Sequence, residues 1–265
     1  MIGIFVGDCV GSRFEWENIK TKEFELFAEK SYLTDDSIMT LAIAEAILNA
    51  EKEHGKLSLL AVKYMQKLGR LYPVGYGTYF REWLATDNPK PYGSFGNGSA
   101  MRVSPCAYAG KTLDEALSIA KTVTEVTHNH AEGIKGAFAT TTAIFMALNK
   151  AKKSEIAEAI GETYYPMNFT LDGIRADYKF DATCQGSVPQ AIKAFLESTD
   201  FEDSIRNAVS IGGDSDTIAA ITGSIAGAYY GVPDKLKQKI LTYMDDYQKD
   251  IIKRFTDKYV TNNAN

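Results

Sequence analysis

The stretch SIGGDSDTIAAITGSIAGAYYG, from Ser210 to Gly231, combines two unlike parts. Its first part places Asp214, Asp216 and the hydroxyl of Thr217 directly after a pair of glycines. Its second part has the composition of a helix made almost entirely of small residues. Such a helix lets another backbone approach closely, although each internal glycine costs about 1 kcal/mol relative to alanine. We therefore expect a tightly packed core helix that begins at a group of acids.

A second predicted helix begins with the same chemistry, far earlier in the chain. In YLTDDSIM, at 32–39, Thr34 precedes the adjacent Asp35 and Asp36. Neighbouring carboxylates cost free energy unless a cation or a proton compensates them. Oxygen ligands without histidine or cysteine suit magnesium, manganese or calcium better than zinc. Each motif alone also resembles an ordinary helix cap, because Thr and Asp are common there, but capping does not explain why the pattern recurs.

Composition narrows the class of protein. A chain of 265 residues with 45% hydrophobic and 24% charged residues predicts one globular domain over 1–265. The net charge of -5, with no basic run, argues against extended nucleic-acid binding. Cys9, Cys106 and Cys184 are too widely spaced for a zinc site or a disulfide framework. With no signal peptide or membrane span visible, we expect a cytoplasmic monomer.

Helical periodicity dominates the chain, and strand alternation hardly appears. Two segments rich in glycine, proline, asparagine and aspartate, 93–104 and 165–187, are predicted as loops, and loops of this length are often functional. The predicted helices are 36–53, 57–68, 78–85, 113–126, 134–148, 154–161, 188–197, 202–211, 217–230 and a helical region from 234 toward the C-terminus. The sequence therefore predicts a single all-α domain.

Five motifs occur in a fixed order along nearly the whole chain: GDCVGSRFE at 7–15, LTDDSIMTLAIAEAIL at 33–48, SFGNGSAMRVSP at 94–105, VTHNHAEGIKGA at 126–137, and the opening stretch. Together they resemble the ADP-ribosylglycohydrolase family. The resemblance implies an orthogonal helical bundle around a binuclear magnesium or manganese centre, with the active-site cleft at one end. It implies a hydrolase that separates ADP-ribose from an acceptor.

The resemblance also implies roles for the acids. The metal ligands would be Thr34, Asp35, Asp36, Asp214, Asp216 and Thr217. Cleavage at the anomeric carbon develops oxocarbenium character, so the site needs a positioned water, nearby negative charge and help for the leaving group. Asp35, Asp36 or Asp216 could accept a proton, and the sequence does not rank them. Glu15 matches a family glutamate on a loop over the metals and is a candidate gate or acid/base residue, while Asp8 would order that loop or support the ligands.

Other motif residues would bind the ADP-ribose portion. Glycines in the segment from Ser94 to Ser99 let backbone amides approach a pyrophosphate, and the alternative is a plain surface turn, because Asn-Gly is a common turn dipeptide. Arg102 would pair with phosphate or form a structural salt bridge. His128 would hydrogen-bond the ligand or serve a structural role, and His130 is not demanded by the motif. The predicted ligand-binding residues are Ser94, Phe95, Gly96, Asn97, Gly98, Ser99, Met101 and His128, with Phe95 against the adenosine portion or distal ribose.

The acceptor is open at this point. The compact chain suits an open cleft for a protein side chain, or a small ADP-ribosylated molecule, and arginine is favoured only by analogy with the bacterial branch of the family. A different hypothesis is a catalytically silent ADP-ribose-binding module, although all six ligand positions carry suitable residues. A third is a helical protein whose paired acids are only caps.

Overall fold

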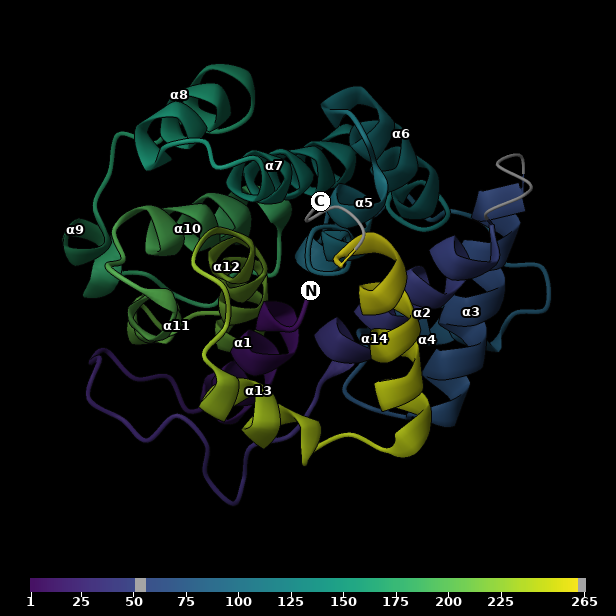
Figure 1. Cartoon of the computed structure of the whole chain (residues 1–265), viewed down its shortest axis with the longest axis horizontal. Coiled ribbons are helices and arrows are strands. Elements are labelled where there is room, and N and C mark those ends of the chain that lie inside the picture. Colours follow the sequence, from purple (N-terminus) through teal and green to yellow (C-terminus); the bar gives the residue numbers. More distant parts are fainter. Residues whose placement is uncertain (51–55, 262–265) are drawn as a thin grey trace.

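The computed structural model describes residues 1–50 and 56–261, and all its regular elements longer than a single β-bridge are helices (Figure 1). The prediction of an all-α fold is confirmed. The helices are α1 (Gly3–Gly11), α2 (Asp35–Asn49), α3 (Leu57–Leu71), α4 (Thr78–Ala85), α5 (Ser104–Ala109), α6 (Leu113–Thr124), α7 (Ala131–Leu148), α8 (Lys153–Thr163), α9 (Leu171–Arg175), α10 (Cys184–Leu196), α11 (Phe201–Ser210), α12 (Ser215–Tyr229), α13 (Asp234–Leu241) and α14 (Asp246–Tyr259), with 3-10 turns η1 (Ser12–Phe14) and η3 (Asn97–Ser99). None of the described helices is both long and apolar enough to cross a lipid bilayer.

Helix α12, the helix of small residues, packs against α1 near the middle of the molecule (Figure 1). The two backbones approach so closely that a Cβ on Gly7 would lie 1.9 Å from the carbonyl oxygen of Ala219. A Cβ on Gly3 would likewise lie 2.0 Å from the carbonyl oxygen of Gly223. The predicted close approach at α12 is therefore confirmed, and its partner is α1.

Helical periodicity did not predict α1 as an element. Every residue of α1 is buried, so the helix has no polar face and shows no amphipathic pattern. The informative signal is instead the spacing of Gly3, Gly7 and Gly11, which places one glycine per turn along the face toward α12.

This packing makes a stability prediction. Gly7→Ala should lower the free energy of unfolding by about 3 kcal/mol, because the new methyl group meets backbone atoms of α12 that cannot rotate away. Gly161→Ala on α8 is the matched control, since its Cβ would meet nothing within 4 Å, and it should stabilise the protein by up to about 1 kcal/mol. Urea unfolding followed by circular dichroism measures both, and equal effects would contradict the packing described here.

Several predicted boundaries were wrong for identifiable reasons. Helix α3 continues through Gly69, where the missing side chain leaves room for Leu84. Helix α10 begins at Cys184 rather than 188, because the Thr183 side chain caps it by accepting from the amide of Gly186. The two predicted loops contain η3 and α9, and α5 begins where the first of them ends.

The ends of two other predicted helices also differ. Helix α2 ends at Asn49 instead of 53, and positions 51–53 lie outside the described residues. The predicted C-terminal helical region is divided into α13 and α14. The break falls at Asp245, whose side chain accepts from the amide of Gln248 while the side chain of Gln248 accepts from the amide of Asp245.

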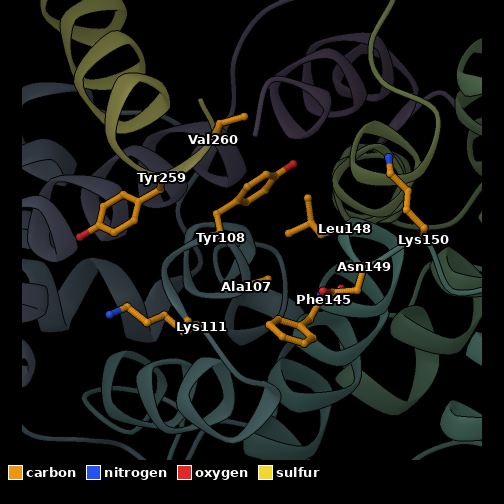
Figure 2. Close-up of a pocket in the computed structure, with 10 residues that line it drawn as sticks. Ala107, Tyr108, Lys111, Phe145, Leu148, Asn149, Lys150, Tyr259 and Val260 are labelled. Atoms are coloured by element: carbon orange, nitrogen blue, oxygen red, sulfur yellow. The ribbon is translucent and has the colours of Figure 1, made fainter. Parts of the chain in front are cut away.

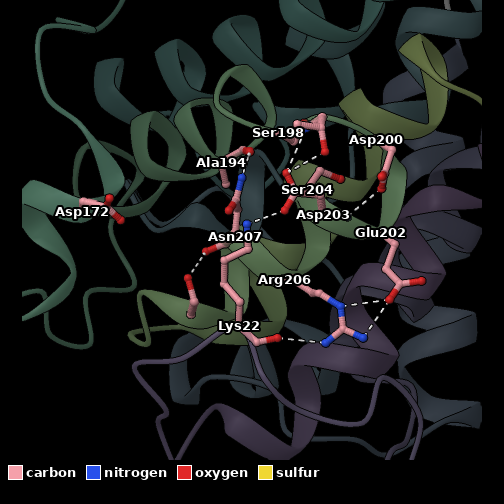
Figure 3. Close-up of polar contacts among 12 residues, drawn as sticks. Lys22, Asp172, Ala194, Ser198, Asp200, Glu202, Asp203, Ser204, Arg206 and Asn207 are labelled. Carbon is pink, nitrogen blue, oxygen red and sulfur yellow. Dashed lines mark hydrogen bonds and ion pairs between the residues drawn. The ribbon is translucent and has the colours of Figure 1, made fainter.

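Helix α11 holds the irregular segment 17–33 against the bundle (Figure 3). The guanidinium of Arg206 donates to the carbonyl oxygens of Lys22 at 2.9 Å and Phe24 at 2.7 Å, and it also pairs with Glu202 on its own helix. Lys22 forms a further ion pair with Asp203. These contacts fix the segment that leads from Glu15 to the start of α2.

Candidate active site

The two acidic helix starts lie together in the structure. The hydroxyl of Thr217, at the start of α12, donates to Oδ2 of Asp36, at the start of α2, over 3.2 Å. Carboxylate oxygens of Asp8, Asp36 and Asp216 lie within 4.8 Å of one another, and so do those of Glu15, Asp214 and Asp216. The acids that the family resemblance groups in one ligand set therefore lie together in the structure.

A tight turn delivers Asp214 to this cluster. Gly212 and Gly213 have φ values of 69° and 78°, a backbone region that favours glycine. The side chain of Asn18 forms two hydrogen bonds with this turn. Its Nδ2 donates to the carbonyl oxygen of Gly213 at 2.9 Å, and its Oδ1 accepts from the amide of Gly213 at 2.7 Å. Asn18 thereby ties the segment carrying Glu15 to the turn. Asn18 is not among the predicted site residues, and its position shortly after the first motif is the signal in the sequence that points to it.

Asp8 organises the start of α2 from the neighbouring helix α1. Its carboxylate accepts from the amide of Thr34 at 3.0 Å, the hydroxyl of Thr34 at 2.7 Å and the amide of Ser37 at 3.1 Å, and the Ser37 hydroxyl donates to it as well. The supporting role expected for Asp8 fits these contacts. Thr34 also caps α2, as the capping hypothesis predicts.

The second motif does not follow the capping hypothesis. Asp214 occupies the N-cap position of α12, but its side chain makes no capping hydrogen bond to the helix backbone. Its Oδ2 instead accepts from Nδ2 of Asn97 at 2.6 Å, which connects the acid cluster to the segment 94–99. The geometry thus places Asp214 at the junction between the acids and the glycine-rich loop.

Burial and mutual repulsion hold the acids toward their protonated forms. Burial, followed by the charge of Asp216, raises the pKa of Asp8 to about 7 and that of Glu15 to about 7. The same two causes raise the pKa of Asp35 and Asp36 well above its usual range. Removing one negative charge or adding a cation would favour ionisation of the rest.

The donor atoms fit a hard divalent cation. Oδ1 of Asp36 and Oδ1 of Asp216 are buried without a hydrogen-bond partner, whereas the carboxylate of Asp8 is already occupied by its four donors. Unpartnered carboxylate oxygens in a buried, all-oxygen cluster are what magnesium or manganese binds. Asp36 and Asp216 are therefore the best placed to hold a cation, with Asp35, Asp214, Glu15 and the hydroxyls of Thr34 and Thr217 beside them.

A pocket of about 410 Å³ opens onto the acids. Its lining includes five residues of the acidic motifs and the first motif, Glu15, Asp35, Asp214, Asp216 and Thr217, together with Ser94, Gly96, Asn97, Gly98, Met101 and His128. Thr34 and Asp36 are not among its lining residues. Of the predicted ligand-binding residues, Phe95 and Ser99 do not line it: Phe95 is exposed beside His130, and Ser99 is buried with its hydroxyl on the carbonyl oxygen of Gly96.

Only part of the backbone from Ser94 to Ser99 is available to a ligand. The amide of Asn97 donates to the carbonyl oxygen of Ala182 at 2.8 Å, and that of Gly96 donates to the Ser94 hydroxyl at 3.2 Å. The amide of Ser99 donates to Gly96. Within the described chain, the amides of Ser94, Phe95 and Gly98 have no hydrogen-bond partner. Of the amides expected to donate to a pyrophosphate, only these three are therefore free to do so.

A second cavity, of about 540 Å³, is lined by residues of α5, α7 and α14 (Figure 2). Tyr108, Phe145 and Leu148 surround it, with Lys111 and Lys150 on opposite sides. None of the described residues that line it carries a carboxylate side chain. This cavity therefore lacks the chemistry of the acid cluster.

The fold and the site together define a class: helical proteins with a buried cluster of carboxylates at one end of a pocket. The family model for ADP-ribosylglycohydrolase matches residues 1–264, and the chain belongs to this family. It is similar to ADP-ribosylhydrolase ARH3 of Homo sapiens, with 26% identity over 92% of this chain and 88% of that protein. It is also similar to ADP-ribosylarginine hydrolase Tri1 of Pseudomonas putida (strain GB-1), with 26% identity over 88% of this chain and 70% of that protein. A solved structure titled ADP-ribosylglycohydrolase-related protein complex shares the fold, with a TM-score of 0.70 and 23% identity over 97% of this chain and 94% of the other.

Proposed function

We propose that this protein is a divalent-metal-dependent hydrolase that cleaves the glycosidic bond between ADP-ribose and an acceptor. The observation that carries the proposal is the convergence of two acidic helix starts, far apart in sequence, on one pocket. A buried group of carboxylates with raised pKa values and unpartnered oxygens has no structural advantage by itself. A functional reason for keeping it is therefore needed, and family membership supports this one.

Each part of the pocket has a task in this proposal. Two magnesium or manganese ions held by the ligand set would orient the ribose hydroxyls and favour ionisation of the water that attacks the anomeric carbon. Asp35 and Glu15 line the pocket beside the ligands, where either can accept a proton. The free amides of Ser94 and Gly98, which both line the pocket, would donate to pyrophosphate oxygens, and the remaining negative charge would stabilise an oxocarbenium-like transition state.

Two aromatic rings at the pocket favour a planar, cationic acceptor such as arginine. Trp16 and Phe180 stack with ring centroids 5.2 Å apart, and they are 76% and 45% exposed although both line the pocket near Glu15. An exposed aromatic face attracts a guanidinium group, and the surplus of carboxylates nearby attracts its charge. The relative named as an ADP-ribosylarginine hydrolase supports the same choice.

Release of free ADP-ribose tests the proposal directly. With ADP-ribosylarginine as substrate, we expect turnover in the presence of magnesium or manganese and at least a 100-fold loss of rate with chelator, because the acids alone cannot orient the ribose. An ADP-ribosylserine peptide tested in parallel should react more slowly. Bound ADP-ribose without turnover of either substrate would favour the silent binding module instead, and the same rates with and without chelator would contradict the metal dependence.

We also propose that the protein acts as a cytoplasmic monomer. The free and buried state of Cys9, Cys106 and Cys184 supports a reducing compartment, since none of the three is paired in a disulfide.

A further inference from the structure

Arg102 is buried in the wall of the pocket without a charged partner. Its side chain is 1% exposed, and none of the ion pairs of the described chain includes it. The structural salt bridge considered from the sequence is therefore absent from the described residues. Its Nη2 donates instead to the hydroxyl oxygen of Thr127 at 2.6 Å. A buried guanidinium that is aimed at a neutral hydroxyl needs an explanation.

The hydroxyl of Thr127 connects Arg102 to His128. Its oxygen lies 2.7 Å from Nδ1 of His128 and 3.4 Å from the carbonyl oxygen of Thr124. The hydroxyl has one proton to give, and its oxygen already accepts from a cation. That cation polarises the O–H bond and disfavours a second N–H donor aimed at the same oxygen. The shorter contact is therefore the one in which Thr127 donates and Nδ1 of His128 accepts.

This hydrogen bonding determines where the proton of a neutral imidazole resides. Burial and the charge of Arg102 keep the pKa of His128 well below its usual range, so the ring is neutral at physiological pH. When Nδ1 accepts, the single ring proton must be on Nε2. Nε2 faces the glycine-rich loop, 3.2 Å from where a Cβ on Gly98 would lie, and it has no hydrogen-bond partner among the described residues.

We infer that Arg102 and Thr127 together hold His128 as its Nε2–H tautomer, so that His128 presents a hydrogen-bond donor to the pocket. Arg102 is then a positioning residue that acts through Thr127, and His128 is not a general base. If the proposed function holds, the Nε2–H group would donate to a phosphate or ribose oxygen beside Gly96 and Gly98.

The tautomer can be measured without substrate. Long-range ¹H–¹⁵N correlation spectra of the ¹⁵N-labelled full chain distinguish a protonated from an unprotonated ring nitrogen, and His128→Gln identifies the signals of this ring. We expect Nε2 protonated and Nδ1 unprotonated in the wild type, and the same in Thr127→Ser, which keeps the hydroxyl. Thr127→Val should give a mixture of tautomers. A wild-type ring protonated at Nδ1, or a valine variant that keeps the pure Nε2–H form, would overturn the inference.

Ligand affinity gives a second readout that does not depend on turnover. By calorimetry, ADP-ribose should bind about fivefold more weakly to Thr127→Val than to wild type, since part of one hydrogen bond is lost, and equally well to Thr127→Ser. Equal affinity in all three proteins would overturn the role of His128 as a donor to the ligand. Absence of hydrolysis by the wild type would count against the proposed function alone, because the tautomer and the affinities are measured separately.

Discussion

Replacing Asp216 with asparagine is expected to lower kcat/KM for ADP-ribose release by roughly 10³-fold and, at the same time, to raise the melting temperature of the chelated protein by about 5 °C. The activity falls because Asp216 belongs to both groups of clustered carboxylates. Its replacement therefore removes a candidate ligand from each of the two groups. The stability rises because the charge of Asp216 is among the causes that raise the pKa of Asp8, Glu15, Asp35, Asp36 and Asp214. Asparagine removes that repulsion while keeping the shape of the side chain.

The opposite signs of the two effects make this test informative. Glu162→Gln, an exposed change on α8, is the control and should leave both activity and melting temperature unchanged. Asp35→Asn should also lose most of the activity. Near-normal rates in both aspartate variants would exclude the proposed ligand set, and a lower melting temperature of Asp216→Asn in chelator would show that repulsion does not dominate the cluster.

The sequence predicted the helices whose apolar residues follow helical spacing because one face of the helix is buried and the other is exposed. Helix α4 has the predicted bounds because its apolar residues follow helical spacing and its ends are exposed. Helix α1 was missed because it is buried on all sides, and α10 was cut short because Gly186 disfavours a helix locally. In that helix, the cap formed by the Thr183 side chain on the amide of Gly186 outweighs the intrinsic propensity of the residue.

The site was predictable in its acids but not in the contacts that support them. Motif resemblance and charge chemistry pointed to the acidic helix starts, which lie together in the structure. The supporting residues depend on distances between remote segments, as with Asn18 on the Gly213 turn and Asn97 on Asp214. No local pattern distinguishes such asparagines from those of ordinary turns. The exposure of Phe95 away from the pocket lining depends in the same way on how the loop packs.

The pH dependence of metal stabilisation should be the second large effect. Adding millimolar magnesium to the chelated protein is expected to raise its melting temperature by about 10 °C at pH 8 and by little at pH 5. The cation binds ionised carboxylates, and burial together with the charge of Asp216 raises the pKa of the candidate ligands Asp35 and Asp36 well above the usual range, so that protons compete with the cation at the lower pH. Without metal, an acid whose pKa is higher in the folded than in the unfolded state lowers the free energy of unfolding as pH rises. The loss takes place between the unfolded-state pKa and the folded-state pKa.

Other groups act in the opposite direction, so the test needs an internal reference. Burial lowers the pKa of the Met1 amino group to about 5 and that of His128 well below its usual range, and both make the chelated fold more stable as pH rises. Asp216→Asn retains these two groups but has less repulsion among the acids. The difference in melting temperature between wild type and this variant, both in chelator, should therefore widen from pH 5 to pH 8, with the wild type the less stable. A constant difference, together with magnesium stabilisation that does not change with pH, would mean that the carboxylates are not the groups that bind the cation.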